Sequence, residues 1–126
     1  MGDVYADISL INPIRDDLQP VKVKALVDTG AAWVCIPEHV SLQLGLKNGE
    51  TREVAMADGR SVVVPYVGPI ELAFENRSCY VGALVLGDEV LLGAIPMEDM
   101  DLVISPSRGT ISVNPESPNI ARGRVK

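Results

Sequence analysis

Residues 21–31 read Val-Lys-Val-Lys-Ala-Leu-Val-Asp-Thr-Gly-Ala. Up to Val27 the side chains largely alternate between apolar and charged, which is the two-residue period of a half-buried strand. The strand ends at Asp28, and Gly30 follows two residues later. A glycine there lets a substrate or a second chain approach the backbone closely, and the hydroxyl of Thr29 can hydrogen-bond within the loop. The stretch predicts a strand that ends in a turn carrying a carboxylate.

The same period predicts strands along most of the chain. Outward from residues 21–27, we expect strands at 4–10, 31–36, 50–56, 61–67, 70–74, 78–86, 89–93, 102–104 and 110–113. Residues 12–20 contain two prolines and several charged residues and are predicted to form a loop. Many short strands with closely spaced turns are typical of a small, mostly β barrel or sandwich.

One or two short helices are expected between these strands. Pro37 and Glu38 suit the first turn of a helix that ends near Leu44, with Gly45 as a left-handed stop. We expect this helix to be the longest in the protein. A single helical turn is expected at residues 96–100.

The turns carry signals of their own. Asp58-Gly59 lies between two alternating runs and predicts a hairpin in which both residues take positive φ. A second hairpin is expected around Asn76 and Arg77, and a further turn at Gly87.

The expected organisation is one domain, residues 1–113, followed by a Pro-rich, basic tail, residues 114–126. The tail is either a mobile end or an arm that lies on a partner.

The composition argues against several partners. The formal net charge is −6, which disfavours binding to nucleic acid. No apolar run is long enough to cross a bilayer, and the first residues lack the basic and apolar regions of a signal peptide. We therefore expect a cytoplasmic protein with no membrane partner. Cys35 and Cys79 are interpreted as buried thiols, with a bridge between them left open.

The residue types present argue against several classes of catalytic site. His39 is the only histidine, so neither a zinc site nor a serine or cysteine nucleophile with an imidazole base is expected. The chain has no phosphate-binding glycine loop and no nucleophile elbow. No metal and no cofactor are expected. Asp28 remains, but Asp-Thr-Gly by itself is more often an ordinary turn than a catalytic site, so its context decides.

Three segments resemble parts of the retropepsin-like aspartic proteases. Residues 26–31, Leu-Val-Asp-Thr-Gly-Ala, resemble their active-site loop. Residues 90–94, Val-Leu-Leu-Gly-Ala, resemble their second signature, and residues 54–60, Val-Ala-Met-Ala-Asp-Gly-Arg, resemble the flap hairpin. The order and spacing match, and residues 91–106 are similar to the prokaryotic branch. The flap has one glycine where the family often has more, which leaves the size of the substrate open.

The resemblance implies a closed β-barrel of the acid-protease type that hydrolyses peptide bonds in a polypeptide substrate. It implies that Gly93 packs against the Asp28 loop, and Trp33 is expected in the core or at an interface. The catalytic segment it implies is Asp28, Thr29 and Gly30, and the substrate contacts are Ala31, Ala57, Asp58 and Gly59.

The proposed chemistry needs two carboxylates that share one proton, and aspartic proteases are the standing example of such a pair. This chain has a single Asp-Thr-Gly, so the second Asp28 must come from a second copy across a two-fold axis. The resemblance implies that Thr29 hydrogen-bonds across to the partner's loop. We expect a homodimer held by residues 21–27 and by pairing of the chain ends.

Two alternatives stay open. The first is a non-catalytic dimeric module that keeps this fold and binds peptides or serves as a scaffold. The second is a protease that processes only itself, with residues 115–126 as its substrate.

Overall fold

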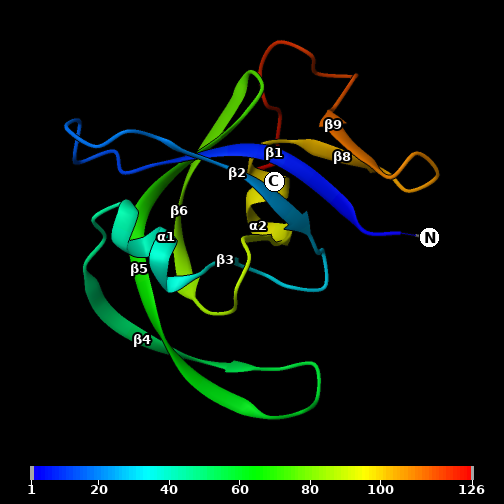
Figure 1. The fold of residues 1–126 in the computed structure, drawn as a ribbon. Helices are drawn as coiled ribbons and strands as arrows, with labels where there is room; N and C mark the ends of the chain where they lie inside the picture. The colour runs from blue at the N-terminus through cyan, green and yellow to red at the C-terminus, as the bar shows by residue number, and fades with distance from the viewer. Residues whose placement is uncertain (1, 126) are drawn as a thin grey trace.

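The computed structural model describes residues 2–125 and is mostly β, as expected (Figure 1). Its strands are β1 (Val4–Ile11), β2 (Val21–Val27), β3 (Val34–Ile36), β4 (Asn48–Ala55), β5 (Ser61–Phe74), β6 (Arg77–Val85), β7 (Leu91–Leu92), β8 (Leu102–Ser105) and β9 (Thr110–Val113). Its helices are α1 (Glu38–Gln43) and α2 (Ala94–Asp99). Neither helix in this part of the chain has the length and apolar character needed to span a membrane.

Six strands close into a barrel in the order β1-β2-β7-β3-β6-β5. Closure depends on β1, which pairs antiparallel with β2 along its length and with β5 through residues 9–11. β4 extends the sheet beyond β5, and the two strands project from the barrel as a long hairpin (Figure 1). β8 and β9 form a separate two-stranded sheet. The predicted closed β-barrel is confirmed.

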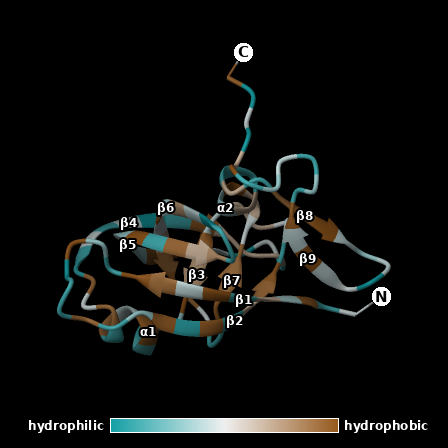
Figure 2. Cartoon of the chain, turned by 90° about the horizontal axis from the view of Figure 1, so that it is seen from above, coloured by the Kyte–Doolittle hydropathy of each residue, from teal (hydrophilic) through white to brown (hydrophobic). Residues whose placement is uncertain are grey.

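The core follows from the alternation seen in the sequence. In β1 the side chains of Ala6, Ile8 and Leu10 are buried, while the alternate residues Tyr5 and Asp7 are exposed. The other barrel strands contribute in the same way, and Figure 2 shows hydrophobic and hydrophilic residues interspersed along them. Burying one large aliphatic side chain contributes about 1.5–3 kcal/mol, so this interior is the main source of stability.

Several strands differ from their predicted bounds by one or two residues at an end, and three regions differ more substantially. β3 begins at Val34 rather than at residue 31, because the preceding carbonyl groups accept hydrogen bonds from α2 and not from a strand. The strands predicted at 61–67 and 70–74 are one strand, β5. Its register against β6 shifts between Val67 and Ile70, where Pro69 has no N–H to donate to a ladder. The strand predicted at 89–93 is reduced to the two residues of β7.

The expectation of positive φ for both Asp58 and Gly59 is wrong for Asp58. Only Gly59 has positive φ, at 89°. The Met56 N–H donates to the Arg60 carbonyl at 2.7 Å, which closes a wider loop with the glycine at its left-handed position. The second hairpin turns at Glu75, whose φ is 50°, and β6 already begins at residue 77.

Both predicted helices are present, but their relative length differs from the prediction, and α2 begins at Ala94, two residues before the predicted start at Pro96. α1 ends beside Gly45, whose φ of 63° is the expected left-handed stop. α2 has six residues, as α1 does, so α1 is not the longer helix. His39 is exposed on α1, as expected for a solvated residue.

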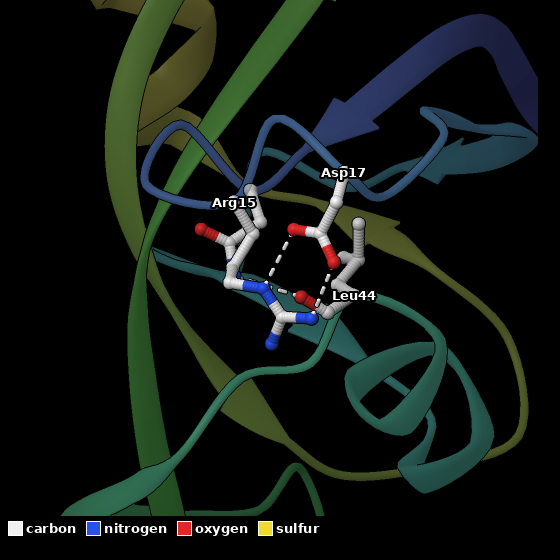
Figure 3. Close-up of polar contacts among 4 residues, drawn as sticks. Arg15, Asp17 and Leu44 are labelled. Atoms are coloured by element: carbon white, nitrogen blue, oxygen red, sulfur yellow. Dashed lines mark hydrogen bonds and ion pairs between the residues drawn. The ribbon is translucent and has the colours of Figure 1, made fainter.

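The loop between β1 and β2 is fastened to the end of α1. The buried side-chain amide of Asn12 donates to the Leu44 carbonyl at 2.8 Å. Beside it, Arg15 donates from Nε and Nη2 to both carboxylate oxygens of Asp17, at 2.8 and 2.7 Å (Figure 3). The hydrogen bond from Arg15 lowers the pKa of Asp17. Because this ion pair is exposed, the buried Asn12 bond is the stronger anchor of the loop.

The first part of the predicted tail is bound to its own chain. The carboxylate of Asp101 accepts hydrogen bonds from the Ser117 hydroxyl, from Asn114 Nδ2 at 3.0 Å and from the Arg122 amide at 3.0 Å. These bonds, led by that of Ser117, lower the pKa of Asp101 to about 2. The guanidinium of Arg77, which is 4% exposed, donates to the Ser117 carbonyl. The polar contacts hold the chain past the last strand against the barrel.

Candidate active site

Asp28 lies directly after β2, where two strands hold its backbone. The N–H of Leu26 donates to the Val90 carbonyl at 2.9 Å, and the N–H of Asp28 donates to the Leu92 carbonyl at 3.0 Å. These are bonds of the parallel pair β2–β7. Asp28 is therefore fixed at the edge of the barrel, and its side chain is exposed.

The turn after Asp28 orients the carboxylate. The N–H of Gly30 donates to Asp28 Oδ1 at 2.9 Å, and the N–H of Ala31 donates to the Asp28 carbonyl at 3.2 Å. A Cβ on residue 30 would lie 3.1 Å from Asp28 Oδ1, which is tighter than ordinary contact. Glycine at this position therefore leaves room for the hydrogen bond that holds Asp28 Oδ1. Thr29 is exposed between the two residues.

Gly93 packs closely against the backbone of this turn, as expected. A Cβ on Gly93 would lie 2.3 Å from the Trp33 carbonyl oxygen and 2.8 Å from that of Ala31. Gly93 has ordinary extended backbone, with φ of −87° and ψ of −172°. The residue is thus required for close approach of two backbone segments and not for an unusual conformation.

The start of α2 completes the support. The N–H of Ala94 donates to the Ala31 carbonyl at 2.8 Å, and the N–H of Ile95 donates to the Ala32 carbonyl at 3.0 Å. These are amides of the first helical turn, which have no partner within their own helix. The bonds tie the Asp28 loop to the helix that follows the second sequence motif.

The predicted flap tip is at the end of the β4–β5 hairpin. Ala57, Asp58 and Gly59 are exposed there. Asp58 turns back along the hairpin, accepting from Arg60 Nε at 2.6 Å and from the Arg60 amide at 3.0 Å. In Figure 1 this turn and the loop after β2 point to the same side of the view. Among residues 2–125, no hydrogen bond joins the two.

An apolar cluster lies between the hairpin and the barrel, and the sequence patterns did not single it out. We call it the flap cluster. Its fully buried members are Val54, Val64 and Leu84, and its half-buried members are Trp33, Cys35, Met56, Val62, Tyr66 and Leu86. The sequence did contain a signal for this cluster, because every second residue of β5 from Val62 to Tyr66 belongs to the cluster. Those residues face away from the main core.

Cys35 connects the flap cluster to Asp28. Burial raises the pKa of the Cys35 thiol, and the negative charge of Asp28 raises it further. Cys35 also pairs with Leu91 of β7, and the neighbouring Leu92 carbonyl accepts the hydrogen bond from the Asp28 N–H, so a single strand separates this wall of the cluster from the Asp28 loop. Cys35 and Cys79 are both free, in agreement with their interpretation as thiols. Among the described residues, no group of three or more His, Cys, Asp or Glu side chains is arranged to hold a metal ion.

The family comparison agrees with this geometry. The sequence model of the family described as "gag-polyprotein putative aspartyl protease" matches residues 17–98, about two thirds of the chain. The chain belongs to this aspartyl protease family. The matched region begins in the loop before β2 and ends within α2, so it includes Asp28, the flap hairpin and Gly93. No curated protein matches the chain in sequence.

Proposed function

We propose that this aspartyl protease domain is an endopeptidase whose active site is shared by two copies of the chain. The observation that carries the proposal is the state of Asp28. Its carboxylate is oriented by the Gly30 N–H, held by two strands, and exposed on the surface of a single chain. A second carboxylate from the same motif is not available within one chain. A two-fold axis beside this loop brings two Asp28 side chains together.

The chemistry follows from the pair. Two carboxylates at close range share one proton, because ionising both is costly. The ionised Asp28 removes a proton from a water molecule, while the protonated one donates to the oxygen of the scissile carbonyl. The water oxygen bonds to the carbonyl carbon. The Asp28 that took the water proton then gives it to the amide nitrogen, while the Asp28 that is now ionised removes a proton from a hydroxyl of the tetrahedral intermediate. The C–N bond breaks and the pair again holds one proton.

The other predicted residues have supporting roles in this proposal. Thr29 of each chain hydrogen-bonds across the axis, and residues 21–27 with the chain ends hold the dimer. The backbone at Ala31 and at the flap tip, Ala57 to Gly59, pairs with an extended polypeptide in the manner of an added strand. The ion pair between Asp58 and Arg60 supports a flap tip whose backbone, rather than the Asp58 side chain, faces the substrate. Free thiols at Cys35 and Cys79 are compatible with the reducing cytoplasm, which we propose as the compartment.

The decisive variant is Asp28→Asn, assayed on an unfolded polypeptide such as β-casein at pH 4 to 7. Its rate should fall by about 10²–10⁴-fold or more, because one general acid–base pair is lost. Asp16→Asn, an exposed aspartate in the loop before β2, is the matched control and should keep its rate. Activity that persists in pure Asp28→Asn would falsify the mechanism and leave the non-catalytic module as the reading of the fold.

Sharing of the site has its own test. When wild-type chain is mixed with about a tenfold excess of Asp28→Asn, random pairing should leave few dimers with two Asp28 residues, so most of the activity should disappear. A site complete within one chain predicts that the added variant has no effect.

A further inference from the structure

One face of β6 carries an apolar stripe that the proposed catalytic residues do not use. Tyr80, Gly82 and Leu84 alternate along the strand and therefore face the same side of the sheet. The residues between them, including Val81 and Ala83, face the main core. Leu84 belongs to the flap cluster and pairs with Cys35 of β3, which pairs with Leu91 of β7, the strand that holds the backbone of Asp28. The stripe thus begins in the flap cluster and runs outward to Tyr80.

The outer part of the stripe is hollowed. One open groove of about 230 Å³ is lined by Trp33, Tyr66, Tyr80, Gly82, Ile95 and Pro96, among others. It adjoins a second, of about 620 Å³, which shares Tyr66, Tyr80 and Gly82 and continues towards Gly68 and Lys47. Three of the five aromatic residues of the chain line this surface. We call the two grooves together the outer groove.

Gly82 is the floor of the outer groove, and Tyr66 is fixed above it. A Cβ on Gly82 would lie 2.2 Å from the Tyr66 hydroxyl oxygen, so the tyrosine ring occupies the space of the missing side chain. The guanidinium of Arg52 lies over the same ring, 4.1 Å from its centroid. Tyr66 is therefore preorganised by contacts on its own chain. Tyr80 and Ile95 are 66% and 47% exposed, which leaves both free to contact a ligand.

The smaller groove favours an uncharged occupant, because no charged residue of the described chain lines it. Lys47 and Glu50 border the larger groove, and Arg52 Nη2 forms an ion pair with Glu50 at 3.2 Å. An exposed aromatic side chain beside an apolar one, with a preorganised ring as neighbour, is the kind of surface that anchors another aromatic or aliphatic side chain.

We propose that the outer groove binds an aromatic or aliphatic side chain of the polypeptide substrate, at a position beyond the residues that the catalytic cleft and flap enclose. The proposal rests on the endopeptidase function proposed above. We choose this occupant because the apolar stripe is continuous from the flap cluster, which lies between the flap hairpin and the barrel, to Tyr80. In a symmetric dimer one such groove lies at each end of the cleft, so long substrates gain a contact that short ones cannot make.

The test compares substrates of two lengths. Cleavage sites in β-casein are first mapped by mass spectrometry, and peptides of eight and sixteen residues centred on one site are then synthesised. Tyr80→Ala should raise KM for the longer peptide about tenfold, the effect of losing one interface anchor, with kcat unchanged. It should leave the shorter peptide unaffected. Tyr5→Ala, a tyrosine on β1 that is 43% exposed, is the matched control and should alter neither peptide.

A second measurement separates this proposal from the catalytic one. Binding of fluorescein-labelled β-casein to the full-length Asp28→Asn protein is followed by anisotropy, with and without Tyr80→Ala. The added substitution should weaken binding about tenfold whether or not the wild type cleaves. Equal loss on both peptides, or unchanged KM for the longer peptide together with unchanged binding, overturns the outer groove as a substrate site.

Discussion

Gly93→Ala tests whether packing beneath the Asp28 loop is as close as the structure indicates. The new methyl group would lie 2.3 Å from the Trp33 carbonyl oxygen, whereas ordinary van der Waals contact begins at 3.4 Å. The segment from Ala31 to Trp33 must therefore move by about 1 Å. That movement pulls on the two carbonyl groups that accept hydrogen bonds from the start of α2.

The free energy can be assembled from these contacts. Overpacking of this kind costs about 1–3 kcal/mol, and each of two strained backbone hydrogen bonds adds about 1 kcal/mol. Alanine returns about 0.4–1 kcal/mol by restricting the unfolded chain, since the backbone at Gly93 suits any residue. The expected net loss is about 3 kcal/mol in the free energy of unfolding. Because the same movement displaces Asp28, kcat should fall as well.

Urea unfolding followed by tryptophan fluorescence measures this loss, since Trp33 is the sole tryptophan and lies in the affected segment. Protomer concentration must be held constant, because a dimer is more stable at higher concentration. Gly49→Ala is the matched control: a Cβ there meets nothing within 4 Å, so its effect should stay within about 0.5 kcal/mol. If Gly93→Ala unfolds at the same urea concentration as Gly49→Ala, the packing argument fails.

Three further predictions concern groups away from the Asp28 loop. The pKa of Asp101, held at about 2 chiefly by the hydrogen bond from the tail serine, lies below its unfolded value of 3.8. The contribution of the Asp101 carboxylate to stability is therefore complete above pH 4 and is lost as the pH falls towards 2. Urea titrations at pH 7 and 2.5 should show this loss of stability in the wild type, and Asp101→Asn should not show it. Burial raises the pKa of Cys79 to about 12, so iodoacetamide at pH 8 should label Cys79 only after denaturation, whereas the half-buried Cys35 should react slowly in the native protein; rapid native labelling of Cys79 would contradict the packing of β6. A chain ending at Val113 should lose roughly 1–3 kcal/mol, because buried Arg77 then lacks its carbonyl acceptor, whereas removal of only the last four residues should leave the urea midpoint unchanged.

Local signals were sufficient for much of the fold. The alternation in residues 21–27 corresponds to β2 residue for residue, and Gly45 ends α1 in the left-handed conformation that its position predicted. The Thr110–Val113 strand also has its predicted bounds. Such features depend on side chains a few residues apart, so a single sequence carries their information.

Features that depend on contacts between residues far apart in the sequence could not be predicted in this way. Residue 31 looks like the start of a strand, yet its carbonyl is taken by the first turn of α2, more than sixty residues away. The turn at Asp58 and Gly59 depends on the loop length set by pairing of β4 with β5, and this placed only the glycine at positive φ. β5 continues through Pro69 because β1 and β6 pair with it on both sides.

The candidate site likewise has residues that the sequence could suggest and residues that only the tertiary structure brings together. The sequence by itself was enough to propose Asp28 as the catalytic residue, because elimination of other chemistries and the resemblance of the Asp-Thr-Gly-Ala motif to the family need no coordinates. The sequence could also suggest Gly93, since the resemblance of two motifs to those of the family implies that Gly93 packs against the Asp28 loop. Only the tertiary structure assembled the flap cluster and the outer groove, whose residues come from β3, β4, β5, β6 and α2. Periodicity tells which side of a strand a residue occupies, whereas barrel closure decides which strands, and therefore which side chains, become neighbours.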